Sequence, residues 1–158
     1  MSETYTDAFL KRILERAKVL GVVGLSSKTT RPSFFVGRYM KLRGYRIVPV
    51  NPAYVGESFM GVPYVGSLAD LPEDTDFLDL FRRSEDVLPI VEEALERLPK
   101  LQTIWMQIGV VHEEAAALAR AKGVDVVMNR CPKIEHQRLF GELRKGGFNT
   151  GVISSKLT

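Results

Sequence analysis

Apolar positions recur along the chain with two different periods, and these periods predict helices and strands in alternation. Residues 6–18 carry apolar side chains at helical spacing behind Thr6, a suitable cap, so they predict an amphipathic helix. The segment VLGVVGL at 19–25 is β-branched and apolar on both faces, which is typical of a central parallel strand. A second amphipathic helix follows Pro32 and stops at Gly44.

The same alternation continues through the rest of the chain. Apolar runs predict four further strands, at 46–50, 76–81, 103–107 and 124–128. Helical patterns lie in the segments 84–98, 112–123 and 133–143. Pro89 should disturb the first turn of the first of these helices, and a Gly- and Pro-rich segment spans 51–66.

Repeated strand, helix, strand order implies right-handed crossovers between parallel strands. The sequence therefore predicts an α/β fold, with a Rossmann-like, doubly wound, mostly parallel five-stranded sheet and helices on both faces. Such sheets bind ligands beyond the carboxyl ends of their strands. Here those ends are the loops 24–33, 51–57, 81–84, 107–112 and 129–133, where polar and cationic residues gather.

Composition narrows the class of protein. A chain of 158 residues with 45% hydrophobic and 26% charged residues is most simply one globular domain, spanning 1–158. The net charge of +3 is spread along the chain, which gives weak support for nucleic acid and suits a small anionic ligand. Cys131 is the single cysteine, and no apolar run approaches membrane-spanning length, so we expect a cytoplasmic protein that uses no membrane.

The first of these loops, 24–33, has the chemistry of a phosphate site. Gly24 allows a tight turn, Lys28 and Arg31 supply charge, and Pro32 suits the first turn of the next helix. The free N–H groups of that helix would face the loop. Hydroxyl groups come from Ser26, Ser27, Thr29, Thr30 and Ser33. The alternative is a plain polar connection between strand and helix.

Two missing patterns limit which phosphate compound would bind. Neither the G-x-G-x-x-G pattern of dinucleotide sites nor the P-loop pattern of triphosphate sites occurs. Strand two ends in Asn51 and Pro52, where an NAD site would normally place an acidic residue, so NAD is disfavoured. NADP stays open, because Arg43, Arg46 or Arg82 would suit a 2′-phosphate.

Four segments, VVGLSSK, VPVNP, MQIG and NRCP, occur in the order found in a known family. Over roughly residues 15–140 the chain resembles the CoA-binding domain of the succinyl-CoA synthetase alpha subunit, and still more the small stand-alone CoA-binding proteins of bacteria and archaea. The resemblance implies coenzyme A as the cofactor. It assigns the CoA phosphates to Gly24, Ser26, Ser27, Lys28, Arg31 and Ser33.

The resemblance also implies roles for the other loops. Asn51 and Pro52 resemble the turn beside the adenosine, and Gln107, Ile108, Gly109, Asn129 and Cys131 lie in segments that resemble the lining of the pantetheine path. The remaining site residues are Phe81, Arg82 and Arg83. They stand where the synthetase has an apolar-Pro turn. Because the sequence differs from the synthetase here, the roles of the two arginines stay open.

The function that follows is a module that binds CoA or an acyl-CoA without a visible catalytic set. One alternative is an NADP-linked oxidoreductase domain, for which no proton donor can be assigned. The other is a CoA-binding subunit that acts with a partner ligase. The sequence does not distinguish a free binding protein from such a subunit.

Four residues with reactive or titratable side chains need separate interpretation. Cys131 is either an inert core thiol or a reactive one near the CoA thiol, with a pKa lowered by Arg130 and by helix N–H groups. Asp79 lies in an apolar strand and should need a hydrogen-bond partner. His112 is expected to be structural, and His136 to be solvated or a cap, so no metal site is predicted.

Overall fold

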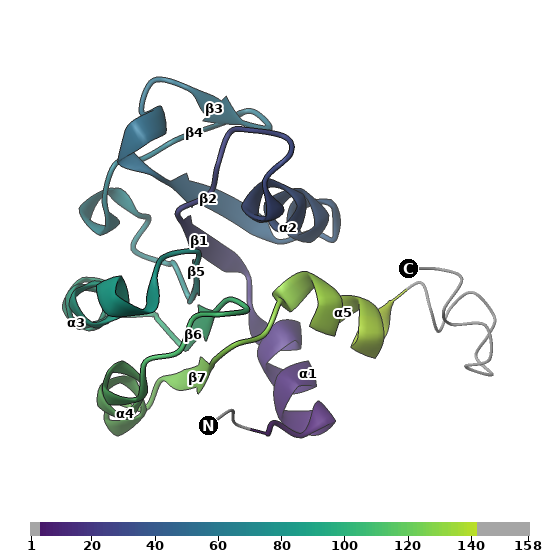
Figure 1. The fold of residues 1–158 in the computed structure, drawn as a ribbon, viewed down its shortest axis with the longest axis vertical. Helices are drawn as coiled ribbons and strands as arrows, with labels where there is room; N and C mark the ends of the chain where they lie inside the picture. Colours follow the sequence, from purple (N-terminus) through teal and green to yellow (C-terminus); the bar gives the residue numbers. More distant parts are fainter. Residues whose placement is uncertain (1–3, 142–158) are drawn as a thin grey trace.

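Strands rich in buried aliphatic residues form a parallel sheet at the centre of the molecule (Figure 1). The computed structural model describes residues 4–141. The strands are β1 (Val19–Val23), β2 (Arg46–Val50), β5 (Phe77–Leu80), β6 (Thr103–Met106) and β7 (Asp125–Val127). They lie in the order β2-β1-β5-β6-β7, and each neighbouring pair is parallel. This confirms the predicted fold class.

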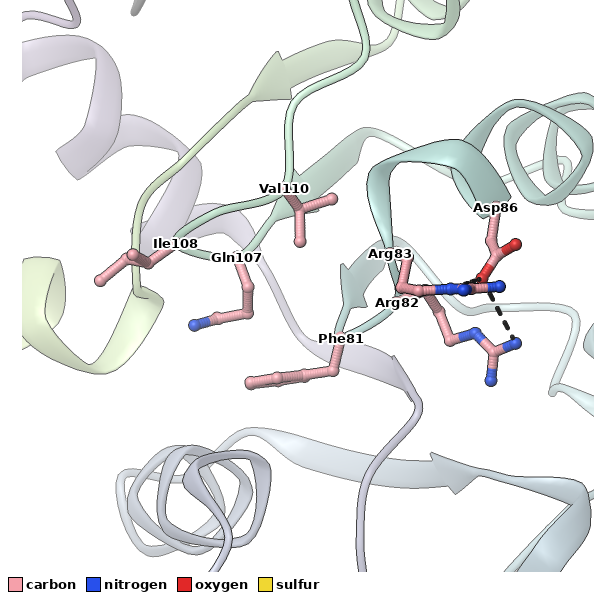
Figure 2. A pocket seen from close by; sticks show the side chains of 7 residues that line it. All are labelled: Phe81, Arg82, Arg83, Asp86, Gln107, Ile108 and Val110. Carbon is pink, nitrogen blue, oxygen red and sulfur yellow. Dashed lines mark hydrogen bonds and ion pairs between the residues drawn. The ribbon is translucent and has the colours of Figure 1, made fainter.

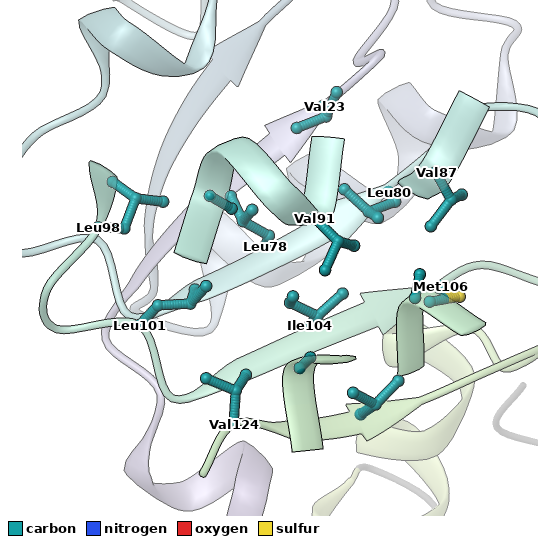
Figure 3. Close-up of a cluster of buried hydrophobic side chains, with 14 of the residues drawn as sticks. Val23, Leu78, Leu80, Val87, Val91, Leu98, Leu101, Ile104, Met106 and Val124 are labelled. Carbon is teal, nitrogen blue, oxygen red and sulfur yellow. The ribbon is translucent and has the colours of Figure 1, made fainter. Parts of the chain in front are cut away.

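In the described part of the chain, five α-helices cover the sheet, with both faces occupied as predicted (Figure 1). They are α1 (Asp7–Arg16), α2 (Pro32–Leu42), α3 (Val87–Arg97), α4 (Glu113–Ala121) and α5 (Pro132–Phe140). Helices α3 and α4 contribute to one apolar core, in which Val87 and Val91 of α3 lie among Leu80 and Ile104 of the strands (Figure 3). Helices α1, α2 and α5 contribute to the core on the opposite face.

The first and last helices contact one another on that second face (Figure 1). The Arg138 guanidinium of α5 lies 2.8 Å from the Asp7 carboxylate of α1. Just before α1, the Tyr5 hydroxyl accepts a hydrogen bond of 2.8 Å from the Met128 amide, which follows β7. The two ends of the described chain are therefore tied to each other.

Local signals explain most element boundaries. The Thr6 hydroxyl accepts a hydrogen bond from the Phe9 amide, which confirms the expected cap of α1. Strand β1 ends at Val23, two residues earlier than predicted, because Gly24 turns with a φ of 91°. Pro89 lies within the first turn of α3, after a short 3-10 turn at Ser84–Asp86, and a helix tolerates proline there. The part of the last predicted helix beyond residue 141 lies outside the described residues.

The Gly- and Pro-rich segment 51–66 contains structure that the sequence did not predict. After a 3-10 turn at Pro52–Tyr54, strands β3 (Ser58–Phe59) and β4 (Val62–Pro63) form a small antiparallel hairpin. The Phe59 ring packs edge-on against Phe34 of α2, with the ring centroids 5.4 Å apart. The hairpin thus rests on the helix that follows the 24–33 loop.

The strand order creates a switch point at the carboxyl edge of the sheet. From β1 the chain moves to β2 on one side and then crosses to β5 on the other. The loops after β1 and β5 therefore leave neighbouring strands in divergent directions, which is where doubly wound sheets bind ligands. Within residues 4–141, no helix has the length and apolar character needed to span a membrane.

Candidate ligand-binding site

Two neighbouring hollows lie at the carboxyl edge, beside the switch point. The first has a volume of about 340 Å³ and is lined by Gly24, Ser26, Arg31, Pro32, Ser33, Tyr54 and Phe81. The second has a volume of about 530 Å³ and is lined by Phe81, Arg82, Arg83, Asp86, Gln107, Ile108 and Val110. Because Phe81 lines both, an elongated ligand could extend from one hollow into the other.

Gly24 permits the close approach of the two loops at this point. Its φ of 91° is in the region that favours glycine, and a Cβ added there would clash with the carbonyl oxygen of Phe81. The Gly24 amide also donates a hydrogen bond of 2.8 Å to the Val50 carbonyl at the end of β2. The residue therefore joins three neighbouring strand ends.

Two of the hydroxyls predicted to bind phosphate also shape the 24–33 loop, and their contact with a phosphate stays a prediction. The buried Ser33 hydroxyl accepts a hydrogen bond of 2.9 Å from the Ser26 amide. The Ser26 hydroxyl in turn accepts one of 3.0 Å from the Lys28 amide, and it lies 3.4 Å from the Tyr54 hydroxyl. These contacts fold the loop back onto the start of α2.

The start of α2 is suited to binding an anion. Arg31 occupies the cap position and makes no side-chain cap hydrogen bond, and Pro32 is the first helical residue. The side chains of Lys28 and Arg31 are exposed around this helix end. Helix amide groups, the positive end of the helix dipole and two exposed cations together favour a phosphate group.

Both predicted asparagines bind backbone groups of the site loops. Asn51 donates to the Leu25 carbonyl at 3.2 Å and accepts from the Ala53 amide at 3.0 Å. Asn129, with a φ of 60°, accepts a hydrogen bond of 2.7 Å from the Gly109 amide. These side chains hold the loops in place, and a direct contact of either with a ligand stays a prediction.

The two arginines of the second hollow share one carboxylate (Figure 2). Nitrogen atoms of Arg82 and Arg83 lie 3.8 Å and 3.3 Å from the same oxygen of Asp86. Figure 2 shows the side chains of Phe81 and Gln107 on the opposite side of the hollow, away from the arginines. The hollow thus has an ionic side and a side with an aromatic ring and an amide.

A buried polar group lies on the strand that leads to this second hollow. Asp79 is on β5, and Phe81 follows the end of that strand two residues after Asp79. Asp79 is fully buried, and within residues 4–141 neither of its carboxyl oxygens has a hydrogen-bond partner. The expected partner of Asp79 is therefore not found there. Burial raises the pKa of Asp79 well above its ordinary value, which favours the neutral carboxyl group.

Cys131 occupies the cap position of α5 and is buried. Burial raises the pKa of its thiol, although hydrogen bonds from the Ile134 amide, the Gln107 side chain and the Lys133 amide lower it in part. This direction is opposite to the one expected for the reactive alternative, because loss of hydration outweighs the helix amide groups. The Arg130 guanidinium lies 5.3 Å from the centre of the Tyr5 ring. The inert interpretation of the thiol is favoured.

The two histidines differ in their roles. His112 caps α4, since its Nδ1 accepts a hydrogen bond of 3.1 Å from the Ala115 amide, which confirms a structural role. His136 is half-buried and lies inside α5, so it is not a cap. Its ring packs against Tyr39, Tyr45 and Phe140, and its Nδ1 lies 3.0 Å from the Tyr39 hydroxyl. Over the described part of the chain, no cluster of acidic, His and Cys side chains could hold a metal ion.

Sequence reasoning missed four residues that line the hollows: Pro32, Tyr54, Asp86 and Val110. Tyr54 lines the first, and it was overlooked because it lies in a segment read only as rich in Gly and Pro. Asp86 lines the second. Its position three and four residues after the arginines was a usable signal, because that spacing brings side chains together on a helical turn.

The geometry defines a class of protein: a Rossmann-like α/β domain with a hollowed, cation-bearing carboxyl edge at its switch point. Residues 18–137 match the CoA binding domain family, CoA_binding_2, and the chain belongs to this family. This confirms the family resemblance seen in the sequence.

Individual proteins are similar to this chain in sequence or in fold. YneT of Bacillus subtilis (strain 168) is 40% identical over 131 residues, which cover 83% of this chain and 94% of YneT. The structure of cell-free ID.343 from Thermus thermophilus is 37% identical, with a TM-score of 0.80, and covers 86% of this chain and 100% of that chain. Acetyl-coenzyme A synthetase 1 of Ca. Korarchaeum cryptofilum shares the fold at 20% identity and a TM-score of 0.60, covering 74% of this chain and 26% of that chain.

Proposed function

We propose that this protein binds coenzyme A or an acyl-CoA at the carboxyl edge of its sheet, with the ligand phosphates on the 24–33 loop. The observation that carries the proposal is the start of α2, where Lys28 and Arg31 flank an uncapped helix end at the switch point. Membership of the CoA binding domain family supports coenzyme A as the ligand. A phosphate at this position would gain charge-assisted hydrogen bonds.

The neighbouring hollow offers room for the rest of the ligand. Phe81 connects the two hollows, and Gln107 and the exposed Ile108 present an amide and an apolar surface beyond it. Small-molecule sites combine apolar walls with a few polar groups that fix orientation. The part of CoA that carries amides and a thiol suits such a surface. Among the described residues we assign no catalytic set, so the proposal is one of binding.

The test is calorimetric titration of CoA into the protein and two variants. Lys28→Ala and Arg31→Ala should each weaken CoA binding by about 1–3 kcal/mol, because each removes a charge-assisted contact with phosphate. Lys122→Ala is the matched control, since this exposed lysine follows α4 at the opposite end of the sheet. Unchanged affinity in both loop variants would show that the phosphates bind elsewhere.

A thermal-shift panel tests the identity of the ligand. CoA and acetyl-CoA should raise the unfolding temperature more than NAD, NADP or ATP at equal concentration, because the tighter ligand stabilises the folded state more. Greater stabilisation by NADP than by CoA would contradict the proposal and favour the oxidoreductase alternative.

A further inference from the structure

The charges of the chain are less evenly distributed than its net charge of +3 suggests. Eight of the 22 Lys and Arg residues lie within residues 16–56, and this stretch contains neither Asp nor Glu. In the rest of the chain, the remaining 14 Lys and Arg residues are outnumbered by 19 acids. The acid-free stretch includes the whole of α2, so this helix lies in a strongly cationic part of the molecule.

The outer side of α2 combines these cations with apolar side chains. Phe35, Arg38 and Leu42 follow one another at spacings of three and four residues, so they share one face of the helix. All three are exposed, and the exposed fractions of Phe35 and Leu42 are 41% and 63%. Lys41, three residues after Arg38, borders them. These four residues are called the α2 face below.

The two cations of the α2 face have no acidic partner in the described part of the chain. The Arg38 guanidinium lies 5.8 Å from the centre of the Phe35 ring, and no described carboxylate forms an ion pair with Arg38 or Lys41. In contrast, Arg46, from the same acid-free stretch, has an acidic partner at 3.6 Å. The α2 face therefore presents uncompensated positive charge beside exposed apolar groups.

The occupant of such a face should be acidic and partly apolar. A second copy of this chain is disfavoured, because a symmetric contact would bring the same cations together. Residues 142–158 are disfavoured as well, since they contain three cations and one acid. A nucleic acid interface is polar and would leave Phe35 and Leu42 without apolar contacts, and two apolar side chains offer little area to a membrane.

An acidic amphipathic helix meets both requirements. Phe35 and Leu42 are seven residues apart, or about 10 Å along the helix axis, and one helix can meet the apolar side chains of another at this repeat. Arg38 lies between the two apolar residues along the chain. Carboxylates that flank the apolar side chains of the incoming helix would therefore come close to Arg38 and Lys41.

We propose that the α2 face docks an acidic amphipathic helix of a partner protein. The apolar side chains of that helix cover Phe35 and Leu42, and its carboxylates pair with Arg38 and Lys41. None of the four residues lines either hollow of the ligand-binding site, so docking does not depend on the proposed function. Because α2 begins directly after the 24–33 loop, the partner would lie beside that loop.

Fluorescence anisotropy with a labelled synthetic peptide tests the charged part of the contact. The probe is a helix of about 20 residues with Leu at heptad spacing and Glu at the flanking positions. Arg38→Glu and Lys41→Glu should each weaken its binding by about tenfold, because each replaces an attraction by a repulsion. Lys122→Glu is the matched control, since this exposed lysine follows α4 on the opposite face of the sheet. No peptide binding, or equal binding by all these variants, would overturn the proposal.

Two further substitutions test the apolar part of the contact. Phe35→Ser and Leu42→Ser should each weaken peptide binding by about threefold or more, because each removes apolar area from the contact. Val55→Ser is the matched control, since Val55 is 60% exposed but lies outside the α2 face. An equal loss of binding in this control would show nonspecific apolar association and would contradict the assignment of the docking face.

Other probes decide the class of partner. A peptide with Gln in place of Glu should bind about tenfold more weakly than the acidic peptide. A uridine oligonucleotide and phosphatidylcholine vesicles containing phosphatidylglycerol should also bind more weakly. Tighter binding of either, abolished by Arg38→Glu, would overturn the choice of a protein partner.

Calorimetric titration of CoA separates this surface from the ligand-binding site. Arg38→Glu and Leu42→Ser should bind CoA with unchanged affinity. A variant that loses affinity for CoA together with affinity for the peptide would assign the α2 face to the ligand-binding site and overturn the proposal. If the protein binds the acidic peptide through the α2 face but does not bind CoA, the proposed function fails and the docking face holds.

Discussion

Replacing Asp79 by asparagine should stabilise the protein by an amount that grows with pH. Asp79 lies on β5, is fully buried, and its carboxyl oxygens have no hydrogen-bond partner within residues 4–141. Burial without an opposing cation penalises the charged form and raises the pKa of the carboxyl well above its ordinary value of 3.8. The folded protein therefore keeps a proton that the unfolded chain releases.

The size of the effect follows from this proton. Where the folded state binds one proton more than the unfolded state, the free energy of unfolding falls by about 1.4 kcal/mol for each pH unit. The fall begins as the pH rises above 3.8, the ordinary value, and stops once the raised pKa of the folded state is passed. An asparagine side chain does not titrate, so the Asp79→Asn variant escapes this loss. At low pH the two proteins should be nearly equal, since both side chains are then neutral.

Urea unfolding followed by circular dichroism at several pH values between 4 and 8 measures this difference. Effects of other titrating groups cancel, because both proteins contain them. The advantage of the variant should increase by about 1.1 kcal/mol from pH 4 to pH 5 and by nearly 1.4 kcal/mol for each further pH unit below the raised pKa of the folded state. A difference in unfolding free energy that stays constant across the range would refute the reasoning and mean that Asp79 is charged and compensated in the folded protein.

Three further substitutions test the site loops and one helix cap. Gly24→Ala should lower the free energy of unfolding by roughly 2 kcal/mol or more, as judged by urea unfolding, because its Cβ would meet the Phe81 carbonyl in a strained conformation. Ser33→Ala should weaken CoA binding in calorimetry although no charge is lost, because the Ser26 amide loses its acceptor and the loop loosens. Unchanged affinity would show that binding does not depend on this hydrogen bond. His112→Ala should cost about 0.5–2 kcal/mol of stability with no effect on CoA binding, and an effect on binding would contradict its purely structural role.

Much of the fold could be predicted because its signals are local. Pro32 at the first turn of α2 and the apolar run of β2 gave the bounds that the structure shows. The β3–β4 hairpin could not be predicted, because strands of two residues leave no alternating pattern to detect. The turn between them has Met60 at a φ of 47°, a conformation that its residue type does not suggest.

The position of the candidate site could be predicted from the sequence, but the role of each residue in it could not. Parallel topology alone brings the strand ends to one edge, so the loops 24–33, 51–57, 81–84 and 107–112 each contribute residues to the two hollows, whereas the loop 129–133 lines neither. The roles within those loops depend on contacts between distant residues. Ser33 satisfies a backbone group of its own loop, and Asn51 and Asn129 each satisfy one of a neighbouring loop, and none of these contacts follows from the sequence pattern. The burial that raises the pKa of Cys131 also arises from the packing of the whole domain.

The pairing of α1 with α5 sets an order of events in biosynthesis. The core on their face includes Leu10, near the beginning of the chain, and Leu139, near the end of the described residues. A ribosome must therefore release almost the entire domain before that face can close. Until then, the apolar side of α1 lacks its contacts with α5. Trp105, the single tryptophan, is buried in this core and donates a hydrogen bond of 2.8 Å to the Arg130 carbonyl. Its fluorescence would report the moment at which the two ends of the chain meet.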